Sequence, residues 1–383
     1  MNTLCRYICK CPLRVVSILM MMVVGALFLQ SCTPGNSNSG SNVTTQFYIQ
    51  TNLVSDGAVS ADNTDTKLVN PWGISFSPTG TFWVSDNGTG VTTVYNGAGQ
   101  LFPLAPAVPL VVTIPPPAGS PAGTQSKPTG QVFNGSSTNF VISAGVKTGP
   151  SLFIFATEDG TISGWNPTVN ATNAILVVDN SSSNAVYKGL AISSDSSRLY
   201  AANFQAGTVD MFDSNFAFMF SFTDSLHSPS IDGFAPFNVH DINGKLYVTY
   251  AKQKPGTPDD QSGLGNGFVD VFDENGTLLQ RLASNGTLNS PWGLAIAPAD
   301  FGPFSNALLV GNFGDGRINA FDVTNGSFLG QLSKDAYGNP IIIDGLWALT
   351  FGNGGDAGNT NELFFTAGPN EEANGLFGKL TVP

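Results

Sequence analysis

The sequence predicts an all-β protein, a six-bladed β-propeller whose ring is closed by its N-terminal strand. Its 383 residues include 44 glycines, 24 prolines and 28 phenylalanines, and 11% of them are charged, well below the roughly 25% of ordinary soluble domains. The segment NPWGISF at residues 70–76 returns as SPWGLAI at residues 290–296. Apolar and polar residues alternate in short runs such as GFVDVFD, and no helical periodicity is sustained after residue 31.

The repeat occurs six times, and each copy supplies the strands of one blade. Successive copies lie about 49 to 59 residues apart, which is the spacing of propeller blades. First strands are predicted at 71–74, 128–131, 187–190, 236–239, 291–294 and 346–349. Second strands follow at 82–85, 152–155, 199–202, 246–249, 308–311 and 363–366. Third strands follow at 91–95, 161–165, 208–212, 268–272, 317–321 and 376–380. Fourth strands are predicted at 110–114, 175–178, 218–222, 278–282 and 328–332.

The sixth repeat has no fourth strand of its own, because the chain ends soon after its third. The segment QFYIQTNLVS at residues 46–55 precedes the first repeat and has no partner there. If it pairs with residues 376–380, the ring is closed and no sheet edge remains exposed. We therefore predict a propeller domain over residues 46–383 whose N-terminal strand completes the last blade.

Two successive positions of the first strand lie beside the crowded axis of the ring. One is glycine in four repeats, since little room is left for a side chain there. Asn238 occupies that position in the fourth repeat and is expected to project into the channel. The preceding position holds Trp72, Trp292 and Trp347. These rings either stack on a sugar or peptide or pack between blades, and the burial typical of aromatic residues favours packing.

Residues 1–31 have the pattern of a lipoprotein-type signal peptide. Arg6, Lys10 and Arg14 precede the apolar run VVSILMMMVVGALFL. The run leads into LQSC, which resembles the lipobox at which a bacterial signal peptidase cuts before a cysteine that then carries lipid. The sequence thus predicts lipidation at Cys32, a flexible tether over residues 32–45, and an exported cell-envelope lipoprotein held to the membrane only by its lipid. A plain secreted protein and an uncleaved membrane anchor are the alternatives.

Charge and cysteine content exclude several classes of function. The chain carries 27 acidic residues against 15 lysines and arginines, a formal net charge of −12, so nucleic acid is a poor partner. The other cysteines, Cys5, Cys9 and Cys11, all lie in the predicted signal peptide. The exported chain would therefore have no thiol for a disulfide, a zinc site or nucleophilic catalysis.

Several motifs of the chain resemble those of known propellers. They are the tryptophan-containing repeats, GNGFVDVFD at residues 265–273 and GNFGDGRINAFD at residues 311–322. The chain resembles the NHL-type six-bladed propellers and, more closely, an uncharacterised bacterial family of exported NHL-like proteins. The resemblance covers nearly all of residues 46–380, and it implies the fold and export. It implies no catalytic residue, because that family has no assigned activity.

Propellers usually bind ligands at one mouth of the central channel, where the loops after second strands meet the loops that enter first strands. Asp86, Asn203 and Asn312 occupy equivalent positions in these loops. Their oxygens suit a hard cation such as Ca²⁺, and they form the candidate metal site. The alternative is that each side chain caps its own tight turn. This alternative is favoured because an Asp or Asn recurs at the equivalent position of several blades.

Two more residues belong to the candidate mouth. Tyr250 begins the long loop of residues 250–267, which is either functional or a surface excursion. His240 lies on a first strand beside Asp241, but strand alternation sends these neighbours to opposite faces, which favours a structural histidine over a catalytic base. The complete candidate mouth consists of Trp72, Asp86, Asn203, Asn238, His240, Tyr250, Trp292, Asn312 and Trp347.

No sequence motif of a hydrolase nucleophile, a zinc protease or a nucleotide-binding loop occurs in the chain. We therefore expect a monomeric binding module that takes a protein, peptide or glycan at the mouth. The competing hypothesis is a metal-dependent hydrolase or lyase of the lactonase-like propeller type. Such an enzyme needs three or four oxygen ligands that converge on one ion, and the sequence leaves open whether they do.

Overall fold

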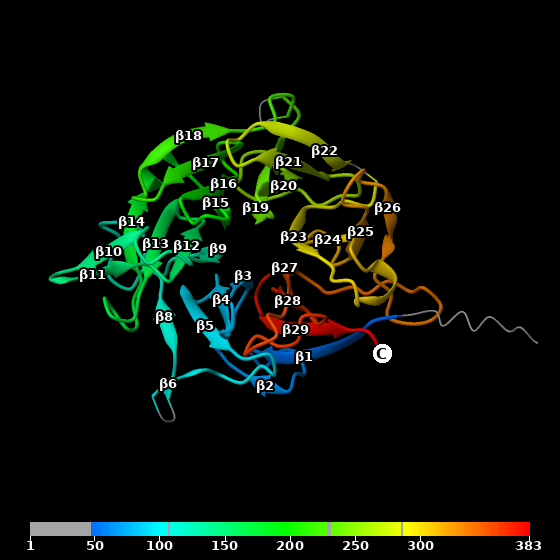
Figure 1. Ribbon diagram of the computed structural model, residues 1–383, viewed down its shortest axis with the longest axis horizontal. Helices are drawn as coiled ribbons and strands as arrows, with labels where there is room; N and C mark the ends of the chain where they lie inside the picture. The colour runs from blue at the N-terminus through cyan, green and yellow to red at the C-terminus, as the bar shows by residue number, and fades with distance from the viewer. Residues whose placement is uncertain (1–46, 106–107, 228–230, 285) are drawn as a thin grey trace, which may run out of the picture. The chain divides into compact units, whose positions relative to one another are not determined.

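The computed structural model describes residues 47–105, 108–227, 231–284 and 286–383 (Figure 1). In these residues, six sheets follow one another around a common axis, and all their strand pairs are antiparallel except β1 with β2 in the last sheet. The predicted signal peptide, the tether and Cys32 lie outside the described residues, so those predictions remain open. None of the helices within the described ranges is long and apolar enough to cross a membrane.

The first three blades each contain four strands. Blade 1 consists of β3 (Pro71–Ser75), β4 (Phe82–Asp86), β5 (Val91–Tyr95) and β8 (Val111–Thr113). Blade 2 consists of β9 (Pro128–Phe133), β12 (Phe153–Thr157), β13 (Thr161–Trp165) and β14 (Ile175–Asp179). Blade 3 consists of β15 (Tyr187–Ile192), β16 (Arg198–Asn203), β17 (Thr208–Asp213) and β18 (Phe218–Phe222).

The remaining blades complete the ring. Blade 4 consists of β19 (Phe234–Ile242), β20 (Lys245–Lys252), β21 (Gly267–Asp273) and β22 (Leu278–Ser284). Blade 5 consists of β23 (Pro291–Ile296), β24 (Leu308–Asn312), β25 (Ile318–Phe321) and β26 (Phe328–Gln331). Blade 6 consists of β27 (Leu346–Phe351), β28 (Leu363–Ala367), β29 (Leu376–Thr381), β1 (Ile49–Ser55) and β2 (Asn63–Thr64).

The N-terminal strand closes the ring, as predicted from the missing fourth strand of the sixth repeat. β1 pairs antiparallel with β29, from Ile49 opposite Thr381 to Ser55 opposite Leu376, and the two strands lie side by side in Figure 1. Tyr48 extends this contact into blade 5, where its backbone N–H donates to the Ser333 carbonyl at 2.8 Å. The two ends of the propeller domain therefore hold one sheet together.

The hydrophobic core is divided among the contacts between neighbouring blades. In the described residues, each blade shares one buried apolar cluster with the next, and a seventh cluster lies on the axis. The alternation of strand side chains explains this arrangement, because both faces of every blade pack against a neighbour. Charged residues are consequently scarce in the strands.

The innermost strands approach so closely that side chains are excluded from some positions. A Cβ on Gly73 would lie 2.3 Å from the Thr129 carbonyl oxygen of the next blade, and a Cβ on Gly189 would lie 2.2 Å from the Asn238 side chain. These contacts explain the recurring glycine. The sequence did not predict two additional hairpins, β6–β7 (Pro103–Ala105, Val108–Pro109) and β10–β11 (Val141–Ala144, Lys147–Pro150).

Candidate functional site

The channel is filled by the side chains that precede the crowded glycine position. All six are nearly inaccessible to solvent. In blade order they are Trp72, Thr129, Lys188, Phe237, Trp292 and Trp347. Four of them belong to one apolar cluster that lies on the axis and spans several blades. The tryptophans therefore close the channel by packing between blades. Of the two interpretations made from the sequence, this is the one that the burial of aromatic residues favoured over stacking on a sugar or peptide.

The aromatic residues in this layer form a stack. The rings of Trp72 and Trp347 stack with centroids 3.5 Å apart, and Phe313 stacks on Trp347 at 4.0 Å. Trp292 meets Trp72 and Trp347 edge-on at 6.1 and 5.8 Å. The indole N–H of Trp292 donates to the Lys188 carbonyl at 2.9 Å, whereas the indole N–H of Trp72 is buried without a partner in the described structure.

Lys188 is the one charged member of this layer, and it makes an ion pair with Glu158 of blade 2. Its Nζ lies 2.8 Å from Glu158 Oε1, with 4% of the lysine side chain exposed. It also lies 5.1 to 5.8 Å from the ring centroids of Trp72, Phe204 and Phe237. Burial disfavours both charges, but the opposite charge outweighs burial, so the pKa of Lys188 is raised and that of Glu158 is lowered.

Above this aromatic layer lies a cavity of about 980 Å³, which we call the mouth. Every blade contributes at least one lining residue, for example Asn87, Glu158, Lys188, Asp260, Phe313 and Glu372 in blade order. Its carboxylates are Glu158, Asp159, Asp259, Asp260, Asp344, Glu371 and Glu372, and its lysines are Lys127, Lys188 and Lys254. The mouth therefore combines an aromatic floor with an acidic wall.

A chain of two amides connects the carboxylates of blades 6 and 2. Asn70 Nδ2 donates to Glu372 Oε2 at 2.6 Å, and its Oδ1 accepts the indole N–H of Trp347 at 3.0 Å. Asn87 Nδ2 donates to Glu158 Oε2 at 3.0 Å, and a longer contact of 3.4 Å joins the two asparagines. Residues that are far apart in the sequence are thus held in one network beside the axis.

Glu371 and Glu372 lie on a turn with an unusual backbone. Asn370, Glu371 and Glu372 have φ values of 58°, 55° and 66°, the left-handed region that non-glycine residues rarely occupy. Each such residue costs about 1–3 kcal/mol of local strain. The turn is closed by hydrogen bonds from the Glu372 and Asn374 amides to the Gly368 and Pro369 carbonyls. It places both glutamates in the lining of the mouth.

The loop predicted at residues 250–267 is shorter than expected, because β20 extends to Lys252, and its residues form part of the mouth. The Gln261 amide donates to the Lys252 carbonyl at 2.7 Å, and the Lys254 amide donates to the Asp259 carbonyl at 2.8 Å. Asp260 Oδ2 is buried without a hydrogen-bond partner in the described structure. Burial raises the pKa of Asp260 and of Glu372, so both carboxylates carry their charge at a cost.

The residues of the candidate metal site bond within their own blades and entering loops. The buried Asp86 accepts the Thr93 hydroxyl at 2.8 Å, and burial raises its pKa well above the usual range. Asn203 Nδ2 donates to Asp210 at 2.9 Å, and Asn312 Nδ2 donates to the Thr287 carbonyl at 2.8 Å. Among the described residues, no group of three or more Asp, Glu, His or Cys side chains is placed to hold a metal ion.

Among the residues proposed for the mouth from the sequence, Trp72 and Trp347 line the cavity. Asn238 is buried between blades, with its Nδ2 donating to the Trp292 carbonyl at 2.9 Å, so it does not project freely into the channel. Tyr250 stacks on Phe268 at 4.3 Å. Asn238, Tyr250 and His240 are not among the residues that line the mouth, and burial lowers the pKa of His240 to about 4.

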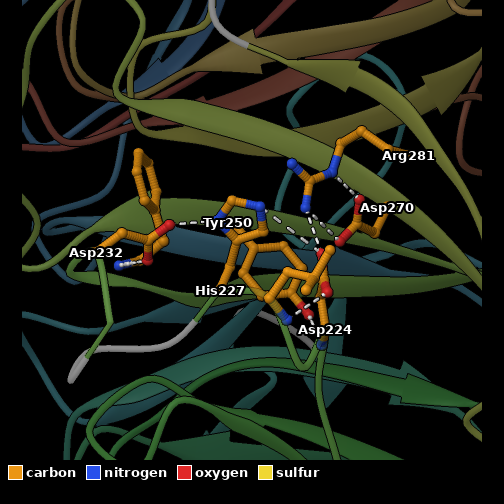
Figure 2. A network of polar contacts seen from close by, with 8 residues as sticks. Asp224, His227, Asp232, Tyr250, Asp270 and Arg281 are labelled. Atoms are coloured by element: carbon orange, nitrogen blue, oxygen red, sulfur yellow. Dashed lines mark hydrogen bonds and ion pairs between the residues drawn. The ribbon is translucent and has the colours of Figure 1, made fainter.

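A second polar network lies in blade 4, and Figure 2 shows it. His227 Nδ1 contacts Asp232, and its Nε2 lies 4.0 Å from Asp224 Oδ2. Arg281 bonds both Asp224 and the buried Asp270. No motif in the sequence marks these partners of His227, because the segment that holds it has no regular spacing. These contacts, with a carboxylate on each side of the ring, hold His227 against blade 4.

The chain belongs to a family of uncharacterized proteins of Acanthamoeba polyphaga mimivirus. It is 35% identical to uncharacterized protein R648 over 334 residues, 86% of this chain and 78% of that protein. It is 33% identical to uncharacterized protein L690 over 86% of this chain and 84% of that protein. The bacterial family inferred from motif resemblance is therefore wrong, because these relatives are viral. No model of a known protein family matches the chain.

Solved structures support the architecture. A streptogramin B lyase structure matches 88% of this chain and 98% of its own length with a TM-score of 0.50 at 12% identity. A nidogen/laminin complex matches 76% of this chain with a TM-score of 0.43 at 14% identity, which is too distant to carry an argument. At such low identity the likeness to the lyase shows the fold alone, and the six-bladed propeller predicted from the sequence is confirmed.

Proposed function

We propose that this protein is a monomeric binding module that takes a protein, peptide or glycan ligand at the mouth. One observation carries the proposal: loops of all six blades line a single cavity whose floor is closed by the aromatic layer. A cavity of about 980 Å³ is large enough for a peptide side chain with its neighbours or for a short oligosaccharide. Its polar wall would fix the orientation of such a ligand.

The contacts of the predicted metal ligands favour binding over hydrolase or lyase chemistry. Asp86, Asn203 and Asn312 each use their side chains to hold their own turns and strands. A metal-dependent enzyme of the lactonase-like type needs such side chains to converge on one ion. The mouth instead spreads its carboxylates around the wall of a wide cavity.

We propose further that the chain is exported and that Cys32 carries a lipid. The support is the basic and apolar pattern of residues 1–31 and the LQSC segment that follows it. The viral relatives remove any argument from a bacterial family, so this proposal rests on those residues alone. Metabolic labelling with a fatty-acid analogue should mark the chain and fail to mark Cys32→Ser. Equal labelling of both would contradict the proposal.

The binding proposal is tested by a thermal-shift screen of peptide and glycan libraries against the full chain. Ser262 is exposed at the lining of the mouth, so Ser262→Trp should obstruct it. Ser60 is also exposed, on a different hollow beside β1 and β2, which makes Ser60→Trp the matched control. A ligand that stabilises the wild type and the control but not Ser262→Trp supports the proposal. Stabilisation that survives in Ser262→Trp would place the binding site elsewhere.

A further inference from the structure

We infer that the mouth takes a cationic ligand, an ammonium or guanidinium group that bonds to Glu372 and Asp260. This inference rests on the proposed binding function and adds to it the chemical class of the ligand. It follows from three features of the cavity: its balance of charge, the orientation of its carboxylates and the chemistry of its floor.

The mouth contains more buried negative charge than the protein itself neutralises. Lys188 faces the carboxylates of Glu158, Asp260 and Glu372, but its ion pair is with Glu158. The other two lining lysines, Lys127 and Lys254, are solvent-exposed. A carboxylate that is partly removed from water without a cation is costly. The raised pKa values of Asp260 and Glu372 are consistent with this deficit.

Glu372 and Asp260 also have oxygens available for a donor. Asn70 holds Oε2 of Glu372, and the Trp347 indole in turn fixes that asparagine, while Glu372 Oε1 has no hydrogen bond among the described residues. Asp260 Oδ2 is buried and makes no hydrogen bond within normal limits among the described residues, although the Ser290 hydroxyl lies near enough to lower the pKa of this carboxyl. A buried acceptor without a donor is rare in folded proteins. Two pre-positioned acceptors in one cavity therefore suit a ligand that carries several N–H groups.

The chemistry of the site favours an organic cation over a metal ion. The acidic side chains of the mouth do not gather into a group of three that could hold a metal, within the described part of the chain. Lys188 shows how an ammonium group is held here, between the Glu158 carboxylate and the faces of Trp72, Phe204 and Phe237. Phe313 presents a partly exposed ring at the same floor, stacked on Trp347. A second ammonium group would find a carboxylate and an aromatic face together.

Such a cation has two sources, a free polyamine or the lysine and arginine side chains of a peptide. Isothermal titration calorimetry of the full chain with spermidine and with hexa-lysine distinguishes them, and hexa-glutamate serves as the negative probe. We expect saturable one-to-one binding of at least one cationic probe at moderate salt. Glu372→Gln/Asp260→Asn should weaken that binding about tenfold or more, because it removes both charged acceptors but preserves their size.

The matched control is Asp62→Asn/Asp300→Asn. Both residues are exposed, and neither side chain makes a hydrogen bond or ion pair among the described residues. This control removes the same two negative charges, so it measures the non-specific attraction of cations to a chain with a formal charge of −12. Circular dichroism of both double variants checks that they fold.

The outcomes separate this inference from the proposed function. Equal weakening by both double variants, or failure of both cationic probes to bind, overturns the cationic ligand. If a glycan or another peptide then binds in a manner that Ser262→Trp abolishes, the binding module stands without the cation. If no ligand of any kind depends on Ser262, both proposals fall. Binding of spermidine alone assigns a polyamine, and binding of hexa-lysine alone assigns a basic peptide.

Discussion

The ion pair between Lys188 and Glu158 gives the sharpest test of the energetics at the floor of the mouth. Lys188→Met keeps the apolar stem among the aromatic rings and removes the ammonium group. At 2.8 Å, two unit charges in an effective dielectric of about 20 attract by about 6 kcal/mol. Most of this attraction offsets the free-energy cost of removing the two charges from water. The variant nevertheless leaves the Glu158 carboxylate partly buried without its cation, which costs about 3–5 kcal/mol of stability.

The penalty depends on pH in a direction fixed by the pKa shifts. The pKa of Glu158 is lowered, so its contribution is present above the ordinary glutamate pKa and is lost as pH falls through the lower folded value. The pKa of Lys188 is raised, so its contribution is present below the ordinary lysine pKa and is lost as pH rises through the higher folded value. The pair therefore stabilises the protein throughout the neutral range.

In Lys188→Met, burial raises the pKa of Glu158 because the compensating cation has gone. The destabilisation measured at pH 7 should then shrink as pH falls and Glu158 takes up a proton. Urea denaturation followed by tryptophan fluorescence, at several pH values, measures both effects. Lys188→Met/Glu158→Gln should recover most of the loss, because an unpaired charge no longer remains. The control Lys127→Met, at an exposed lysine of the same cavity, should change stability by less than about 0.5 kcal/mol.

Two results would refute this reasoning. One is a loss in Lys188→Met no larger than that of Lys127→Met, which would mean that Glu158 is solvated once its partner is removed. The other is a penalty that stays constant as pH falls, which would locate the damage in the packing of the aromatic layer. The double variant distinguishes these cases, since a packing defect persists when Glu158 is neutral.

Three further predictions concern the backbone and the closure of the ring. Gly73→Ala should destabilise the protein by several kcal/mol in urea denaturation, since its Cβ would lie 2.3 Å from a neighbouring carbonyl oxygen. The control Gly135→Ala, whose Cβ would have no atom nearer than 3.8 Å, should be nearly neutral. Equal effects of the two variants would contradict the crowding argument. Glu371→Gly should be about 1 kcal/mol more stable than Glu371→Ala, because both lose the same charge but only glycine removes the backbone strain of the positive φ. Equal stability of the two variants would show that the turn is unstrained. Deletion of residues 1–55 should abolish cooperative unfolding and promote aggregation, because β29 would become an exposed sheet edge. A deletion variant that stays soluble and unfolds cooperatively in calorimetry would show that closure by β1 is dispensable.

The fold could be predicted because its main determinants repeat locally along the chain. The small residue of the innermost strand, glycine in four repeats, and the alternating apolar residues recur at equivalent positions, so each repeat supports the assignment of the next. Closure by residues 46–55 followed from the absence of a fourth strand in the last repeat. The hairpin β10–β11 escaped prediction because it occurs in one blade, so no second copy identifies it.

The mouth was harder to predict because its network joins residues from different repeats. Asn70 and Glu372 are 302 positions apart, and only ring closure brings them together. The left-handed turn at Asn370–Glu372 contains no glycine that would mark it. One signal was available: Lys188 occupies the position held by tryptophan in three other repeats. Repeat alignment predicts a buried residue there, so a lysine at that position indicates a buried partner of opposite charge.

The presence of Lys188 at this position indicates a role in function and not in folding. Replacing a buried ion pair by apolar side chains of similar volume is often neutral or stabilising, and three blades already fill the same position with tryptophan. The fold therefore does not need a charge at this level of the channel. Lys188 and Glu158 instead supply a fixed ammonium and a fixed carboxylate at the floor of a cavity in which Asp260 and Glu372 have no ion pair among the described residues. A Lys188→Met/Glu158→Leu variant should consequently fold at least as stably as the wild type while losing ligand affinity, and a loss of stability with affinity intact would reverse this division of roles.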